Sequence, residues 1–128
     1  MHVEAVKQAA VEALEEIKAR DITVLDVRKL TSLFDYMIVA TAESARQTKA
    51  LAHNVQEKLR DLGVKSQGLE GEQTGEWVLV DLGDVVVHVM QPAIRAYYNL
   101  EQLWGGRPPS PHPTTWRNAP AAEPPAAL

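Results

Sequence analysis

Hydrophobic and polar positions along the first hundred residues follow helix and strand periods in turn. Apolar residues three and four positions apart predict an amphipathic helix over about residues 2–19. A β-branched, roughly alternating segment predicts a strand over 22–28. A nearly continuous apolar run then predicts a central strand over 36–41 that is covered on both faces.

A second helix is marked at both of its ends. Residues 44–47, Ser-Ala-Arg-Gln, match a capping box, so Ser44 is interpreted as a helix cap and not as a nucleophile. An apolar stripe follows over 48–62, and Gly63 supplies the usual C-terminal stop. We expect this helix to cross over to a third strand near 64–69.

Two further strands are predicted over 76–82 and 85–90, after a glycine-containing loop. Gly83-Asp84 between them suits a tight hairpin turn of type II′. The pairing that this turn dictates gives the hairpin one aliphatic face, made of Val78, Val80, Leu82, Val85, Val87 and Val89. It also gives a mixed face, made of Trp77, Leu79 and Asp81 opposite Met90, His88 and Val86.

The aliphatic face is predicted to be core, and the mixed face has the composition of a protein-binding patch. We expect the two long helices to cover the aliphatic face and to leave the mixed face bare for a partner. Two alternatives stay open: the mixed face lies under a helix of the same domain, or it closes a homodimer.

A last helix is predicted over 94–104. Tyr98 in this helix is expected to contribute to binding, whereas its neighbour Tyr97 points the other way.

Composition changes after residue 104. Seven of the eight prolines lie in residues 105–128, together with Gly, Ala, Ser and Thr, so we expect this Pro/Ala-rich segment to be a disordered tail. The folded domain is then expected over 1–104. The chain carries a net charge of -4, and the tail contributes +1, which leaves -5 on the domain.

The charge and the residue types narrow the range of functions. An acidic domain disfavours direct nucleic-acid binding and favours a basic protein partner. The absence of cysteine excludes disulfides, thiolate catalysis and Cys-ligated zinc, and the four scattered histidines lack metal-ligand spacing. We expect no cofactor and no metal. No apolar run is long enough to span a bilayer, so a cytoplasmic location is expected.

Two long segments resemble the ribosomal silencing factor (Iojap-like) family. Residues 35–46 fit its pattern D-[FY]-x-[IV]-x-[AC]-T-x-x-S-x-R. Residues 70–90 contain the run W-V-L-x-D-x-G-D-V-V-V-H-V, and matches within 95–104 complete the resemblance. It covers about residues 2–104, in order and without large gaps, and the W-V-L-x-D-x-G-D-V-V-V-H-V run is too long for chance agreement.

The resemblance implies an α/β domain with a mixed sheet of about five strands, helices mainly on one face and a nucleotidyltransferase-like topology. It also implies a partner: the large ribosomal subunit, bound through its ribosomal protein fourteen, so that joining with the small subunit is blocked and translation is repressed. Carried over by position, the interface residues are Trp77, Leu79, Asp81, His88, Met90 and Tyr98. All but Tyr98 belong to the mixed face deduced from the hairpin.

A nucleotidyltransferase-like enzyme is the alternative from a different functional class. Asp81, Asp84 and His88 could suggest a metal or acid–base cluster. Such enzymes need paired carboxylates aimed at one metal and a glycine-rich phosphate loop, and the sequence shows neither. We therefore expect no catalysis. A homodimeric interaction module is the third hypothesis.

Overall fold

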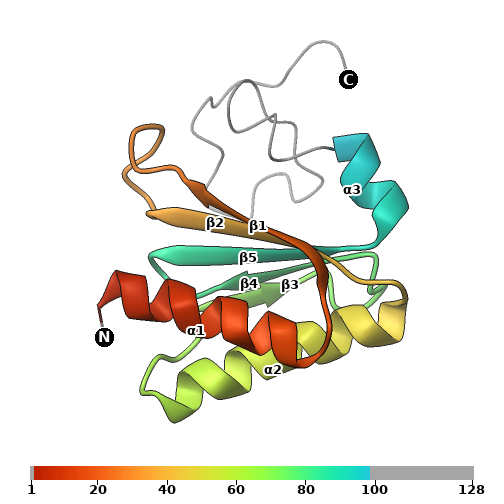
Figure 1. The fold of residues 1–128 in the computed structure, drawn as a ribbon, viewed down its shortest axis with the longest axis horizontal. Helices are drawn as coiled ribbons and strands as arrows, with labels where there is room; N and C mark the ends of the chain where they lie inside the picture. Colours follow the sequence, from red (N-terminus) through yellow and green to blue (C-terminus); the bar gives the residue numbers. More distant parts are fainter. Residues whose placement is uncertain (1, 99–128) are drawn as a thin grey trace.

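The computed structural model describes residues 2–98, which form one five-stranded sheet with helices on both of its sides (Figure 1). The elements in chain order are α1 (Val3–Glu16), β1 (Arg20–Asp26), β2 (Tyr36–Thr41), α2 (Ala45–Asp61), β3 (Gly68–Glu70), β4 (Trp77–Asp81), β5 (Val85–Met90) and α3 (Pro92–Tyr98). The predicted α/β class with a five-stranded mixed sheet is confirmed. Among the described helices, none combines the length and apolar character that a membrane crossing requires.

The strands lie in the order β1-β2-β5-β4-β3. β2 and β5 pair in parallel, and the other neighbours pair antiparallel. The crossover through α2 therefore does not place β3 beside β2, because β5 and β4 lie between them. β2 and β5 are buried along their whole length, as their apolar sequences predict for strands in the middle of a sheet.

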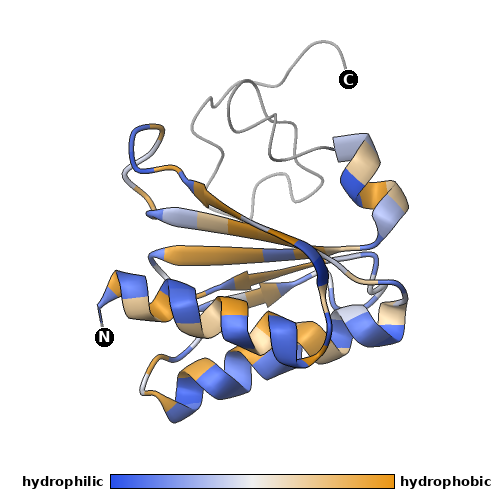
Figure 2. Ribbon diagram, viewed as in Figure 1, coloured by the Kyte–Doolittle hydropathy of each residue, from blue (hydrophilic) through white to orange (hydrophobic). Residues whose placement is uncertain are grey.

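α1 and α2 lie side by side on one face of the sheet, whereas the short α3 lies on the other side (Figure 1). Figure 2 shows hydrophilic residues along the outer sides of α1 and α2 and a largely hydrophobic β5. Between these two helices and the sheet lies the larger core cluster, which includes the whole aliphatic face. The Asn54 side chain donates to the Ala13 carbonyl at 2.8 Å, and Lys58 pairs with Glu16 at 2.8 Å, so polar contacts also join the two helices.

The capping box predicted for α2 is present in a modified form. The Ser44 hydroxyl accepts from the Gln47 amide at 3.0 Å. The Gln47 side-chain oxygen accepts from the Glu43 amide at 2.7 Å, one residue before the position expected for a standard box. Its side-chain nitrogen donates to the carbonyls of Ile17 and Lys18, both at 3.1 Å. This one side chain therefore ties the start of α2 to the end of α1.

The third strand is shorter than the predicted span of 64–69 and covers only Gly68–Glu70. Gly63 has φ +92°, and the Val64 amide donates to the Leu59 carbonyl at 2.8 Å, which is the bond of a Schellman motif. The predicted glycine stop is thus confirmed. Val64, where the strand is predicted to start, instead caps the end of α2.

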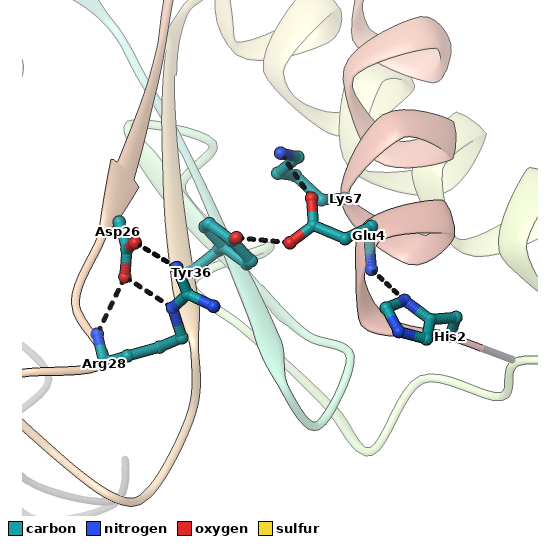
Figure 3. A network of polar contacts seen from close by, with 6 residues as sticks. All are labelled: His2, Glu4, Lys7, Asp26, Arg28 and Tyr36. Carbon is teal, nitrogen blue, oxygen red and sulfur yellow. Dashed lines mark hydrogen bonds and ion pairs between the residues drawn. The ribbon is translucent and has the colours of Figure 1, made fainter.

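A polar network lies where β1 ends and α1 begins (Figure 3). Arg28 donates from Nε and Nη2 to the Asp26 carboxylate at 2.9 and 2.6 Å, and its amide donates to the same group at 3.1 Å. These hydrogen bonds between Arg28 and Asp26 end β1 at Asp26. The strand is predicted over 22–28, so the observed strand starts and ends two residues earlier than predicted. Across from it, Glu4 accepts from Lys7 at 2.8 Å and from the Tyr36 hydroxyl.

The charges of this network act on the same aromatic ring. Lys7 Nζ lies 4.7 Å and Arg28 Cζ 5.3 Å from the centre of the Tyr36 ring, within cation–π range. Hydrogen bonds from Arg28 lower the pKa of Asp26 to about 2. The hydrogen bond from Lys7 lowers the pKa of Glu4, and the bond to Glu4 raises the pKa of Tyr36. The network holds the first turn of α1 against the start of β2.

The last helix starts at Pro92, two residues before the predicted start, since proline is tolerated where the first helical N–H has no partner. The rest of the predicted helix over 94–104 lies beyond residue 98, outside the described residues. The predicted tail over 105–128 lies outside them too, so the domain boundary stays a prediction.

Candidate protein-binding surface

The β4–β5 hairpin has the predicted register. Trp77 pairs with Met90, Leu79 with His88, and Asp81 with Val86. Gly83 has φ +95°, the positive value that the first central position of a type II′ turn requires. The mixed face therefore exists as predicted, on the side of the sheet away from α1 and α2.

The mixed face is not bare, so that part of the prediction is wrong. Its apolar side chains form a second core cluster with Val27 and Phe34 from the loop between β1 and β2, and Ile94 and Tyr98 of α3 pack against that cluster. The exposed fraction is at most 5 % for four of the predicted interface residues, Trp77, Leu79, His88 and Met90. The alternative of cover within the same domain describes these four side chains.

Trp77 and His88 are joined by a buried hydrogen bond. The indole Nε1–H of Trp77 donates to Nδ1 of His88 at 2.8 Å, and the ring centroids are 5.7 Å apart. The two residues are diagonal neighbours on adjacent strands, a distance that large side chains bridge readily. Because an indole nitrogen only donates, His88 carries no proton on Nδ1. The hydrogen bond satisfies the buried donor of Trp77 and fixes the orientation of both rings.

The two tyrosines of α3 face in different directions, as predicted. Tyr98 is half-buried, and its ring centroid lies 5.0 Å from that of Trp77 at an interplanar angle of 52°. The exposed fraction of Tyr97 is 67 %. Its ring packs edge-on against that of Tyr98, with 4.8 Å between the ring centroids. Tyr98 therefore connects the buried ring of Trp77 to the surface.

The aspartates of the hairpin have structural roles. The Asp81 carboxylate accepts from the Gly83 amide at 2.9 Å, and the Asp84 carbonyl accepts from the amides of Asp35 and Tyr36 at 2.7 and 3.1 Å. Within residues 2–98, no three His, Asp or Glu side chains gather in a way that could hold a metal ion. Half-buried Asp81 remains at the edge of the mixed face, where it provides a negative charge.

Sequence reasoning missed the residues that close the mixed face. Phe34 is the only phenylalanine of the chain and directly precedes the predicted central strand, which is a usable signal for a core anchor. The alternating pattern places Val27 in a strand, whereas in the structure it follows the end of β1 and belongs to the loop. No sequence signal marks Arg95 beyond the family resemblance, although it joins α3 to two strands of the sheet.

Comparisons with known proteins decide the family. The family model described as "Ribosomal silencing factor during starvation" matches residues 1–127. The ribosomal silencing factor RsfS of Chromobacterium violaceum is 60% identical over 110 residues, which are 86% of this chain and 90% of that protein. The Bacillus subtilis RsfS is 37% identical over 108 residues, 84% of this chain and 92% of that one. The chain belongs to the ribosomal silencing factor family.

The family extends to solved structures and to plant proteins. A crystal structure of a C. violaceum protein has a TM-score of 0.81 and 60% identity, and the match covers 86% of this chain and 92% of that one. The chloroplastic protein Iojap of Zea mays is 43% identical over 100 residues, which are 76% of this chain and 42% of the longer plant protein. The shared part is thus the silencing-factor domain itself.

Silencing factors of this family are non-enzymatic, ribosome-binding repressors of translation. The enzyme alternative is therefore set aside for this silencing factor. The likeness to a nucleotidyltransferase topology stays a prediction. The binding role of the six carried-over residues also stays a prediction. The structure gives their positions on one side of the sheet, and it contains no partner.

Proposed function

We propose that this protein binds the large ribosomal subunit through its ribosomal protein fourteen, in the cytoplasm, and sterically prevents the small subunit from joining. The proposed contact surface is centred on half-buried Tyr98 and Asp81, at the end of α3 and the rim of the mixed face. The other four predicted interface residues, Trp77, Leu79, His88 and Met90, are buried behind this surface and support it. No reaction and no cofactor are needed, because the effect requires only affinity and position.

The observation that carries this proposal is the convergence of the six residues on one side of the sheet. Tyr98 and Asp81 are half-buried and offer an aromatic ring and a charge at the surface. Behind Tyr98, the buried Trp77 and its bond to His88 hold the ring contact in place. An aromatic centre with a polar rim is typical of the residues that contribute most to binding in protein interfaces.

The charge of the domain supports a protein contact over a contact with bare RNA. Of the 13 basic and 17 acidic residues of the chain, two of each lie beyond residue 98, so residues 2–98 retain the net charge of -4. A negative domain gains nothing from releasing the counterions of RNA phosphates, whereas a basic ribosomal protein attracts it.

The test is co-sedimentation of the full-length protein with isolated large subunits, followed by light scattering after small subunits are added. Wild type should pellet with large subunits and suppress joining, and it should bind purified ribosomal protein fourteen. Tyr98→Ala should weaken both effects without unfolding the domain. Leu62→Ala is the matched control, because Leu62 is exposed at the end of α2, on the other side of the sheet.

Trp77→Ala is less suitable as a binding test, because removing a buried tryptophan costs about 3–5 kcal/mol of stability.

If folded wild type stays in the supernatant at low and moderate salt, the proposal is wrong. If it binds large subunits but not ribosomal protein fourteen, only the partner is wrong.

Self-association through the same surface is the second candidate that the sequence left open. Sedimentation velocity over a range of protein concentrations separates it from ribosome binding. A dimer that Tyr98→Ala dissociates would place this surface between two copies of the chain.

A further inference from the structure

Arg95 of α3 reaches across the end of the sheet to both β1 and β2. Its Nη1 donates to the Asp21 carbonyl at 2.5 Å and to the Thr41 hydroxyl at 2.8 Å, and its Nη2 donates to the Thr23 hydroxyl at 3.0 Å. We propose that Arg95 is a positioning residue that fixes α3 on the sheet, so that Tyr98 stays against Trp77 in the binding surface. This inference rests on the proposed function for its consequence in binding.

The edge strand β1 is shaped to receive this arginine. Its pairing with β2 is irregular between Arg20 and Thr23, and Asp21 has φ +50°, a left-handed conformation that non-glycine residues rarely adopt. A bulge of this kind re-aims backbone groups that would otherwise follow the ladder. Here the Asp21 carbonyl meets the guanidinium of Arg95.

The arrangement of acceptors favours arginine over lysine. The carbonyl of Asp21 and the hydroxyls of Thr23 and Thr41 come from two strands, and one planar guanidinium spans them. A lysine ammonium is a compact point charge and lacks the rigid fork of donors that covers such a spread. Arg95→Lys should therefore replace the contact only in part.

α3 depends on contacts with the sheet to keep its place. None of its described residues, Pro92–Tyr98, is fully buried, and helices in proteins owe most of their stability to tertiary packing. Arg95 and Tyr98 are three positions apart and so lie on neighbouring sites of the helix surface. When the hydrogen bonds of Arg95 are removed, the helix loses its link to β1 and β2, and Tyr98 loses its fixed place beside Trp77.

Hydrogen exchange on the full-length chain tests the positioning itself, without any ribosome. Arg95→Gln should raise the exchange of the α3 amides about tenfold, while the amides of β4 and β5 stay protected. Arg20→Gln is the matched control. Arg20 and Arg95 line one surface pocket, so either change removes a positive charge from it, but Arg20 bonds to Glu43 and not to the sheet acceptors of Arg95. If α3 exchanges as in wild type after Arg95→Gln, the inference is wrong.

A double-mutant cycle with Tyr98 tests the consequence for binding. Arg95→Gln should weaken binding to large subunits about tenfold. The affinity of Arg95→Lys should lie between those of Arg95→Gln and wild type. Arg95→Gln/Tyr98→Ala should bind no worse than Tyr98→Ala alone, since both changes remove one ring contact. Independent, multiplying losses would contradict positioning and indicate that Arg95 touches the partner. If wild type does not bind, the proposed function fails, while hydrogen exchange still decides how α3 is held.

Discussion

The two faces of the sheet are both buried, yet they are built differently. The face under α1 and α2 is almost wholly aliphatic and joins a large core cluster. The mixed face carries a tryptophan, a histidine and a methionine, and it is closed by a loop and a short helix. The buried Nε1 of Trp77 and Nδ1 of His88 are tolerable because they bond to each other across the strands. Mixed composition alone therefore does not show that a face is exposed.

Of the following four variants, the one on the helix-covered face should have the largest effect. Leu51 is fully buried in α2, and Leu51→Ala should lower the free energy of unfolding by about 2–5 kcal/mol, because a cavity remains among close-packed side chains. Urea denaturation followed by circular dichroism measures it. Leu62→Ala, at the exposed C-cap of the same helix, should change stability by about 0.5 kcal/mol or less. If Leu51→Ala loses as little stability as Leu62→Ala does, the assignment of Leu51 to the main core is wrong.

The mixed face should be sensitive to one hydrogen bond. Trp77→Phe keeps a ring but removes the donor to His88 Nδ1, and we expect a loss of about 2 kcal/mol in the free energy of unfolding. The same denaturation experiment measures it, with Tyr97→Phe at an exposed ring as the control. If Trp77→Phe is as stable as wild type, the cross-strand bond does not stabilise this face.

A smaller effect is expected at the start of α2. Ser44→Ala removes the acceptor of the Gln47 amide and should cost about 1 kcal/mol, whereas Ser44→Asp keeps an acceptor and should retain most of the stability. Thermal unfolding of the three proteins provides the comparison. Equal losses in both variants would show that the hydroxyl acts through some contact other than the cap.

The smallest effect should be a dependence on pH at the edge of the helix-covered face. Hydrogen bonds from Arg28 lower the pKa of Asp26 from its ordinary 3.8 to about 2 in the folded protein. A lowered folded pKa means that the stabilisation is present above about pH 4 and is lost as the pH falls towards 2. The difference in unfolding free energy between wild type and Asp26→Asn should therefore shrink over this range. A difference that stays constant from pH 5 to pH 2 would contradict the ion pair.

Local patterns in the sequence predicted most of the elements, because each carries its own signal. The capped helix α2, its Gly63 stop and the register around Gly83-Asp84 depend on neighbouring residues only. Errors arose at the ends of elements, where a cap or a side-chain contact between near neighbours overrides the hydrophobic pattern. The segment 64–67 is not strand, because Val64 closes the helix end, and β1 ends early because Arg28 folds back on Asp26.

The candidate site was predicted in part for the same reason. Alternation along the hairpin placed Trp77 and His88 on one face, and helix geometry separated Tyr98 from Tyr97. The cover over that face could not be inferred, since Val27 and Phe34 reach it from the loop between β1 and β2, which is far from the hairpin in sequence. The contacts of Arg95 likewise join residues more than fifty positions apart.

The sequence by itself determined the α/β elements, the two faces of the hairpin and membership of the ribosomal silencing factor family. These follow from residue order, since periodicity, caps and turns act over a few positions and family patterns are read directly. The tertiary structure alone decided that β5 lies between β2 and β4, that the mixed face is closed, and that Arg95 holds α3. Such features depend on which distant surfaces fit together, and no local pattern encodes that fit.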